Sequence, residues 1–120
     1  TVGTAAWVFA NAILNIPEIA ITGMDLGYHS ETPIEMTQSY YELQEFVSSR
    51  EELEQLFPKF NFPLTGEQFY TDPTYFWYRK NFLELYSQAK GKTYNCSEAG
   101  TLFANNISCI TLNEFLQQEK

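Results

Sequence analysis

The sequence predicts an α/β fold built on a doubly wound, mostly parallel sheet with flanking helices. An apolar helical segment at residues 4–14 is followed, after a tight turn, by an apolar β-branched run at 19–24. A helix followed by a covered parallel strand is the repeating unit of such sheets. Only two or three strands are expected in the 120 residues, whereas these sheets usually have about five or more. The expected class is therefore a partial Rossmann-like sheet.

We expect residues 1–120 to be one unit, the C-terminal part of a larger Rossmann-like domain. The chain begins at Thr1 rather than at methionine and enters an apolar stretch almost at once, as a piece of a longer protein would. Without the rest of its crevice the unit is expected to show no enzymatic turnover. It is also expected to self-associate, because a truncated sheet exposes an apolar edge and face.

The fold prediction rests mainly on the apolar segments at 4–14 and 19–24. The helix at 4–14 has only two polar side chains, so it should be buried on most sides. Asn15 can adopt a left-handed turn, and Pro17 prevents the helix from continuing. The run at 19–24 is expected to be a central strand covered on both faces.

The middle of the chain is more polar. A loop is expected at 26–38, followed by a helical segment at 39–57. Ser39 and Ser49 each have a glutamate three positions later, which is the capping-box signature. The sequence is therefore compatible with one long helix or with two short helices separated near Ser49.

Residues 58–70 contain two prolines and a glycine, and they are expected to be irregular. Asp72 then predicts a helix N-cap with Pro73 at the first position, and the helix should run to about Ala89 before Gly91. The expected inward stripe of this helix is Tyr75, Tyr78, Phe82, Leu85, Tyr86 and Ala89.

The last third should complete the sheet. Short strands are expected at 92–96 and 107–110, with a turn or short helix at 97–104 between them. Thr111 has a glutamate three positions later, which predicts a capped terminal helix at 111–118.

Composition excludes some partners. Seven Lys and Arg residues against fifteen Asp and Glu residues give a net charge of −8, which disfavours nucleic acid and anionic membranes. No apolar run approaches the roughly 18 residues of a membrane span, and no signal peptide is visible. Cys96 and Cys109 have neither disulfide-framework nor zinc-ligand spacing. A soluble, cytoplasmic protein with reduced thiols is expected.

The start of the first helix is one candidate site. Unpaired N–H groups and the positive end of the helix dipole suit a phosphate, and Gly3 would let a ligand approach the backbone. Thr1 or Thr4 could instead be an ordinary cap, with Gly3 present to avoid a clash. The residues alone favour this simpler interpretation.

The end of the strand at 19–24 is a second candidate, because ligands of open α/β sheets bind just beyond the carboxyl ends of the strands. Gly23 and Asp25 follow the strand, and Asp25 could hold a metal or a ligand hydroxyl. Tyr28 could contact a phosphate or stack on a base, or it could belong to the core. His29, the single histidine, could act as a general acid or base, although a solvated loop histidine is more common.

Asn95, Ser97 and Glu98 follow the next predicted strand and could form a second wall of the same crevice. A simple strand-to-helix turn capped by Ser97 is the alternative. The sequence contains no glycine-rich phosphate loop, nucleophile elbow, paired-histidine metal motif or hydrolase triad. It therefore assigns no catalytic residue, no metal ligand and no cofactor.

Taken in order, these segments resemble the core signature of the bacterial motility accessory factor proteins, which share a domain with archaeal 6-hydroxymethylpterin pyrophosphokinase-like proteins. The resemblance begins with residues 1–3, the apolar helix and the run Ile-Ala-Ile-Thr-Gly-Met-Asp-Leu-Gly-Tyr at 19–28. The segments 95–100 and 111–116 are similar to the family's ending. Ala99 departs from it, since the family commonly has a glycine there.

The resemblance implies a glycosyltransferase of flagellin glycosylation and motility, which moves a nonulosonic acid from a CMP-activated donor to flagellin. It implies a nucleotide-sugar donor, a flagellin-type protein acceptor and no cofactor. The implied nucleotide-facing residues are Thr1, Gly3, Gly23, Asp25, Tyr28, Asn95, Ser97 and Glu98. Two other functions stay open: a pyrophosphokinase-like phosphotransferase using ATP and Mg²⁺, and a non-catalytic assembly module.

Overall fold

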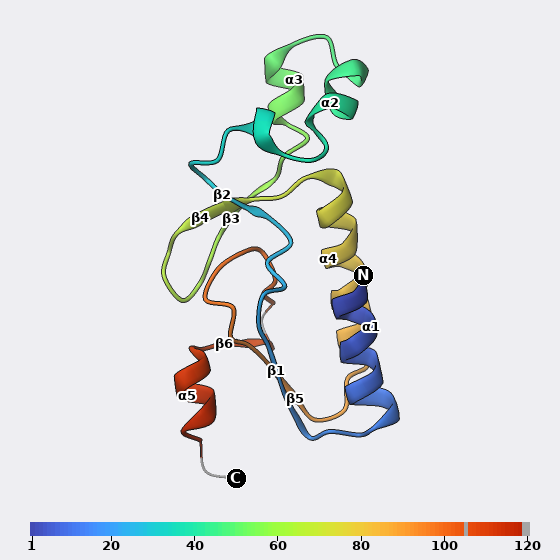
Figure 1. Ribbon diagram of the computed structural model, residues 1–120, viewed down its shortest axis with the longest axis vertical. Helices are drawn as coiled ribbons and strands as arrows, with labels where there is room; N and C mark the ends of the chain where they lie inside the picture. The colour runs from blue at the N-terminus through green and yellow to red at the C-terminus, as the bar shows by residue number, and fades with distance from the viewer. Residues whose placement is uncertain (105, 119–120) are drawn as a thin grey trace.

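The structure, a computed structural model, describes residues 1–104 and 106–118. One of its two sheets is parallel. It consists of β1 (Glu18–Ile21), β5 (Lys92–Asn95) and β6 (Ser108–Cys109) in the order β1-β5-β6. The predicted parallel α/β arrangement is therefore present (Figure 1). The prediction that the first strand is central was wrong, because β5 is the middle strand and β1 is at the edge of the described sheet.

Two helices lie side by side on one face of this sheet (Figure 1). They are α1 (Val2–Val8), which continues as the π-helical segment η1 (Phe9–Ile13), and α4 (Pro73–Tyr86). On the other side lies α5 (Leu112–Leu116), where Phe115 meets Tyr94 of β5 edge to face at 5.2 Å between ring centroids. None of the helices in the described residues is long and apolar enough to cross a membrane.

The core between this helix pair and the sheet is aromatic. Phe82 of α4 is fully buried, and its ring centroid is 5.0 Å from that of Trp7 of α1. The Trp7 Nε1–H donates a hydrogen bond to the Thr93 Oγ1 of β5 at 3.0 Å. Tyr86, Leu102 and further residues complete this cluster. These contacts fix both helices on β5.

A second, antiparallel sheet was not predicted. It consists of β2 (Tyr28–His29), β3 (Lys59–Asn61) and β4 (Gln68–Tyr70) in the order β2-β4-β3. The prediction that residues 58–70 are irregular was wrong, because their prolines flank β3 and leave its ladder intact. Gly66, at φ 76°, closes the hairpin between β3 and β4.

Short helices cap this second sheet at the far end of the molecule (Figure 1). They are η2 (Ile34–Met36), α2 (Tyr40–Leu43), η3 (Gln44–Phe46) and α3 (Arg50–Glu54). The break near Ser49 is confirmed, since the Ser49 Oγ accepts a hydrogen bond from the Glu52 N–H at 3.2 Å. The capping box at Ser39 was wrong, because the Ser39 hydroxyl instead bonds the Asp72 carboxylate.

The first helix differs from its prediction in two respects. It begins at Val2 rather than at Thr4, because Thr1 provides the cap. It is also not buried on most sides: only Trp7 and Asn11 are buried, whereas Val2 and Ile13 are 88% and 63% exposed. The left-handed turn at Asn15 is confirmed, with φ 54°.

The later elements follow the predictions more closely. α4 has Asp72 as its N-cap, as predicted, and Gly91 adopts a positive φ of 75° after it. Leu85, however, points outward and is 46% exposed. The residues at 97–104 form turns and bends rather than a helix. Thr111 caps α5 through the Glu114 N–H, as predicted.

Candidate functional site

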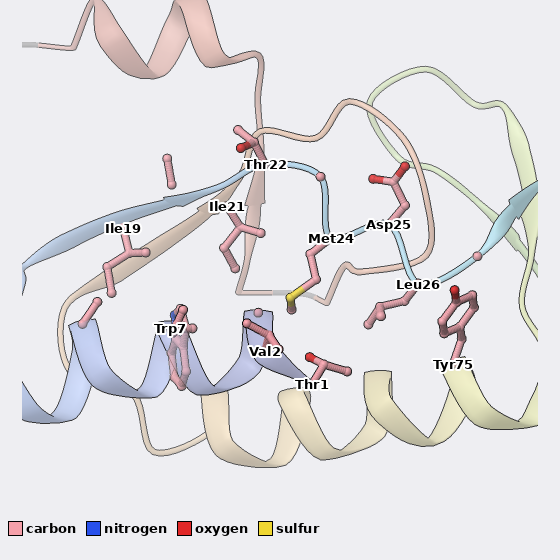
Figure 2. Close-up of a pocket in the computed structure, with 16 residues that line it drawn as sticks. Thr1, Val2, Trp7, Ile19, Ile21, Thr22, Met24, Asp25, Leu26 and Tyr75 are labelled. Carbon is pink, nitrogen blue, oxygen red and sulfur yellow. The ribbon is translucent and has the colours of Figure 1, made fainter.

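A pocket of about 680 Å³ lies between α1 and the strand segment that includes β1 (Figure 2). We call it the sheet-edge pocket. Four of the predicted site residues line it, namely Thr1, Gly3, Gly23 and Asp25. The rest of its wall is largely apolar and comes from α1 and from residues 19–27, with Tyr75 of α4 at one end. Its lining includes residues 22–27, which follow β1, and residues 1–3 at the start of α1.

The start of α1 is shaped by the Thr1 cap and by the close approach of Met24 to Gly3. The Thr1 Oγ1 accepts a hydrogen bond from the Thr4 N–H at 3.1 Å. A Cβ added to Gly3 would lie 2.5 Å from the Met24 sulfur, so the glycine makes room for the thioether over the helix start. Thr1 is therefore a helix cap and Gly3 avoids a clash, which is the simpler interpretation of these two residues. Both residues also line the sheet-edge pocket.

The strand end turns sharply into the pocket wall. Gly23 and Leu26 adopt positive φ values of 74° and 50°. Ile21, Met24 and Leu26 point toward α1, whereas the Asp25 carboxylate points away from the helix (Figure 2). Burial raises the pKa of the Asp25 carboxyl above its ordinary value. Asp25 is thus a partly desolvated carboxylate on the rim of an apolar pocket.

The second predicted wall contacts the first. The Thr101 N–H donates to the Asp25 carbonyl at 2.9 Å, and the Thr101 hydroxyl donates to the Leu26 carbonyl at 2.9 Å. A Cβ on Gly100 would lie 2.5 Å from the Asp25 carbonyl oxygen. The segments at 23–28 and 95–101 therefore pack tightly, as the sequence predicted from their positions after neighbouring strands.

The side chains predicted for that second wall do not line the pocket. Asn95 is fully buried; its Nδ2 donates to the Leu102 carbonyl at 2.5 Å and its Oδ1 accepts from the Ser97 N–H at 3.0 Å. The Ser97 hydroxyl is buried without a hydrogen-bond partner in the described chain. Glu98 is exposed. Asn95 therefore shapes the turn and is not available to a ligand.

Tyr28 also lies outside the pocket. Its ring stacks on Tyr70 of the antiparallel sheet at 5.5 Å, and its hydroxyl accepts from the Gln38 N–H at 3.4 Å. Burial is the main cause that raises the pKa of Tyr28 to about 12. His29 lies in the same strand, with its Nε2 3.2 Å from a Glu67 carboxylate oxygen. Both residues belong to the second sheet rather than to the sheet-edge pocket.

Tyr75 is the pocket residue that the sequence did not reveal. Its position in the aromatic stripe of α4 predicted a core role, and it does pack against the core cluster. The Asp72 cap, whose Oδ1 accepts from the Tyr75 N–H at 2.8 Å, places it in the first turn of the helix. There its hydroxyl points up toward the strand segment (Figure 2).

Backbone strain concentrates at this site. Four of the seven positive-φ residues found in the described chain, Gly23, Leu26, Glu98 and Gly100, lie in the two contacting segments. A left-handed residue other than glycine costs about 1–3 kcal/mol and persists where its surroundings impose it. Leu26 in the pocket wall and Glu98 in the segment packed against it are two such residues.

The described residues contain no group of three or more His, Cys, Asp and Glu side chains that could hold a metal ion. Among those residues, Asp25 supplies the one carboxylate in the wall of the sheet-edge pocket. Comparison of the chain with models of protein families, with curated proteins and with solved structures found no match. The case for a function therefore rests on this geometry and on the sequence motifs.

Proposed function

We propose that the sheet-edge pocket binds the nucleotide part of an activated sugar, in a sheet of Rossmann-like type. The chain would then be part of a glycosyltransferase that moves a nonulosonic acid from a CMP donor to a flagellin-type protein in motility. The observation that carries this proposal is the position of the pocket. Its lining includes residues 22–27, just beyond the carboxyl end of β1, and residues 1–3 at the start of a flanking helix, where open α/β sheets bind their ligands.

The pocket wall offers suitable chemistry despite the acidic composition. The first N–H groups of α1 can donate to a phosphate without any Lys or Arg. The apolar side chains of Ile21 and Leu26 suit the face of a base. The Tyr75 hydroxyl, which points toward the strand segment, can donate a hydrogen bond to the ligand.

Ligand-induced stabilisation tests the proposal. CMP should raise the melting temperature of the chain, by about 5 °C at ten times its dissociation constant. Ala6→Leu should abolish this rise, because Ala6 lines the pocket and the larger side chain fills it. Ala5→Leu is the matched control: Ala5 is also exposed on α1 but lies outside the pocket wall, so the rise should persist.

Each other outcome counts against a CMP-sugar site. Stabilisation by ATP with Mg²⁺ but not by CMP would favour the pyrophosphokinase-like reaction. No response to either nucleotide would favour the non-catalytic assembly module, which the exposed apolar surface of α1 supports.

A further inference from the structure

A second hollow, which we call the helix groove, lies between the start of α1 and the outer side of α4. Its volume is about 530 Å³, within the range of small-molecule sites. The side chains that matter for its chemistry are Thr1, Thr4, Trp77, Asn81, Glu84 and Gln88. The helix groove and the sheet-edge pocket meet at Thr1, which lines both.

The floor of the helix groove is one stripe of α4. Trp77, Asn81 and Glu84 are spaced by four and three positions, so they lie on the same face of α4, and Gln88 follows in the turn after the helix. Trp77 is 61% exposed, whereas Phe82 on the opposite face is fully buried. The helix therefore places its largest aromatic side chain on its polar side, where the ring contributes little to the core.

The polar side chains beside Trp77 are available to a ligand. Within the described residues, the side chains of Asn81, Glu84 and Gln88 make no hydrogen bond or ion pair. Each amide offers donors and an acceptor, and the carboxylate offers acceptors only. The Thr1 and Thr4 hydroxyls also line the groove, where they are hydrogen-bonded to each other at 3.0 Å, and the Thr1 Oγ1 in addition accepts from the Thr4 N–H. The groove thus combines the exposed Trp77 ring, beside Tyr78 and Leu85 in the same lining, with both kinds of hydrogen-bonding group.

We propose that the helix groove binds the pyranose ring of a neutral saccharide. One face of such a ring presents C–H groups, which pack on the electron-rich face of an indole. Its edge carries hydroxyls that both donate and accept, which matches the amides of Asn81 and Gln88 and the carboxylate of Glu84. This inference does not depend on a nucleotide in the sheet-edge pocket.

Charge selects the class of ligand. The Glu84 carboxylate in the groove opposes an acidic sugar. A quaternary ammonium ion would also pack on Trp77, but it has no hydroxyls to satisfy Asn81 and Gln88. A neutral saccharide is the class that uses the aromatic face and the three polar side chains together.

Tryptophan fluorescence and NMR titration test the proposal. The chain has two tryptophans, and Trp7 is 5% exposed, so a blue shift on titration reports Trp77. We expect saturable binding of methyl β-D-glucopyranoside or N-acetylglucosamine on the order of 1 mM. Glucuronate should bind at least threefold more weakly. Choline binding tighter than either neutral sugar would overturn the proposal, as would the absence of any sugar response.

Variants separate this site from unspecific contact. By NMR, Trp77→Ala should weaken the sugar at least about tenfold, the size expected from losing a stacking platform, and Asn81→Ala about threefold or more. Phe46→Ala removes an aromatic side chain that is 81% exposed on η3, away from the groove, and should leave the affinity unchanged. Equal affinity in Trp77→Ala and the wild-type chain contradicts the proposal. Unchanged core resonances in each variant exclude misfolding as the cause of a loss.

Discussion

The two helices on the same face of the parallel sheet differ in how they use their apolar residues. α4 buries Phe82 and Tyr86 and presents a polar stripe to solvent. α1 and η1 are apolar on nearly every side, yet Trp7 is the only large apolar side chain they bury, and Ile13 is 63% exposed. A helix that is apolar all round normally lies within a larger body. We call the α4 side of the fold closed, because its apolar side chains are largely buried in the core. We call the α1 side open, because its apolar surface is exposed to solvent.

The strands differ in the same way. β5 is paired on both sides and three of its four residues are buried, whereas β1 is paired only with β5 among the described strands. The sheet-edge pocket runs along this less covered strand, between β1 and α1 (Figure 2). We expect stability to reside in β5 and the buried side of α4, and self-association and nucleotide binding to use α1 and β1, while the outer side of α4 forms the helix groove. The following predictions test this division.

The largest effect is expected in the closed region. Phe82→Ala should lower the free energy of unfolding by about 3–5 kcal/mol, because it removes a fully buried ring from the core. Leu85→Ala, three positions later on the same helix, should cost about 1 kcal/mol or less, since Leu85 is 46% exposed. Urea unfolding measures both variants. Equal losses in the free energy of unfolding would show that the two faces of α4 contribute alike, and would contradict a closed side at Phe82.

A smaller effect is expected where α1 joins β5. Trp7→Phe and Thr93→Val each remove the hydrogen bond between the indole N–H and the threonine hydroxyl. A double-mutant cycle of the two should give a coupling free energy of about 1 kcal/mol, the usual net value of a buried hydrogen bond. A coupling near zero would mean that Trp7 holds α1 by ring packing alone.

The open surface of α1 should affect association more than stability. We expect the wild-type chain to self-associate with rising concentration in sedimentation or light-scattering experiments. Phe9→Lys together with Ile13→Lys should make it monomeric and change the free energy of unfolding by less than about 1 kcal/mol, because both side chains are exposed. Tyr41→Lys with Phe46→Lys adds the same charge on another exposed surface and should leave association intact. A monomeric wild-type chain contradicts this prediction.

The sequence predicted those parts of the fold whose signals are local. The caps at Asp72 and Thr111 and the left-handed turn at Asn15 each follow from one residue and its neighbours, and each is present. The antiparallel sheet was missed because proline and glycine indicate loops, and only the pairing of β4 with two partners reveals the strands. The burial of α1 was overestimated because composition does not show whether a partner surface is present.

The candidate site was predicted at the level of segments but not of side chains. Strand ends that neighbour each other in a parallel sheet bring their loops together, so the contact between 23–28 and 95–101 could be expected. The direction in which Tyr28 points depends on packing against a residue far along the chain, and that of Asn95 on the path of the loop that follows it. Tyr28 stacks on Tyr70, which no local pattern encodes, whereas Asn95 bonds Leu102 and the Ser97 N–H within its own loop.

The smallest effect concerns Asp25 at the rim of the sheet-edge pocket. Burial raises the pKa of its carboxyl above the ordinary value of 3.8, so the folded chain holds this proton at pH values where the unfolded chain has lost it. The contribution of Asp25 to the free energy of unfolding should therefore be full below pH 3.8 and fall as the pH rises through the raised pKa. Asp25→Asn should remove this part of the pH dependence in urea unfolding. Thr22→Ala, an exposed change beside the same pocket that keeps the carboxyl, should retain the wild-type slope. If Asp25→Asn and the wild-type chain share one pH profile, the carboxyl is solvated, and the open side of the fold extends as far as the pocket rim.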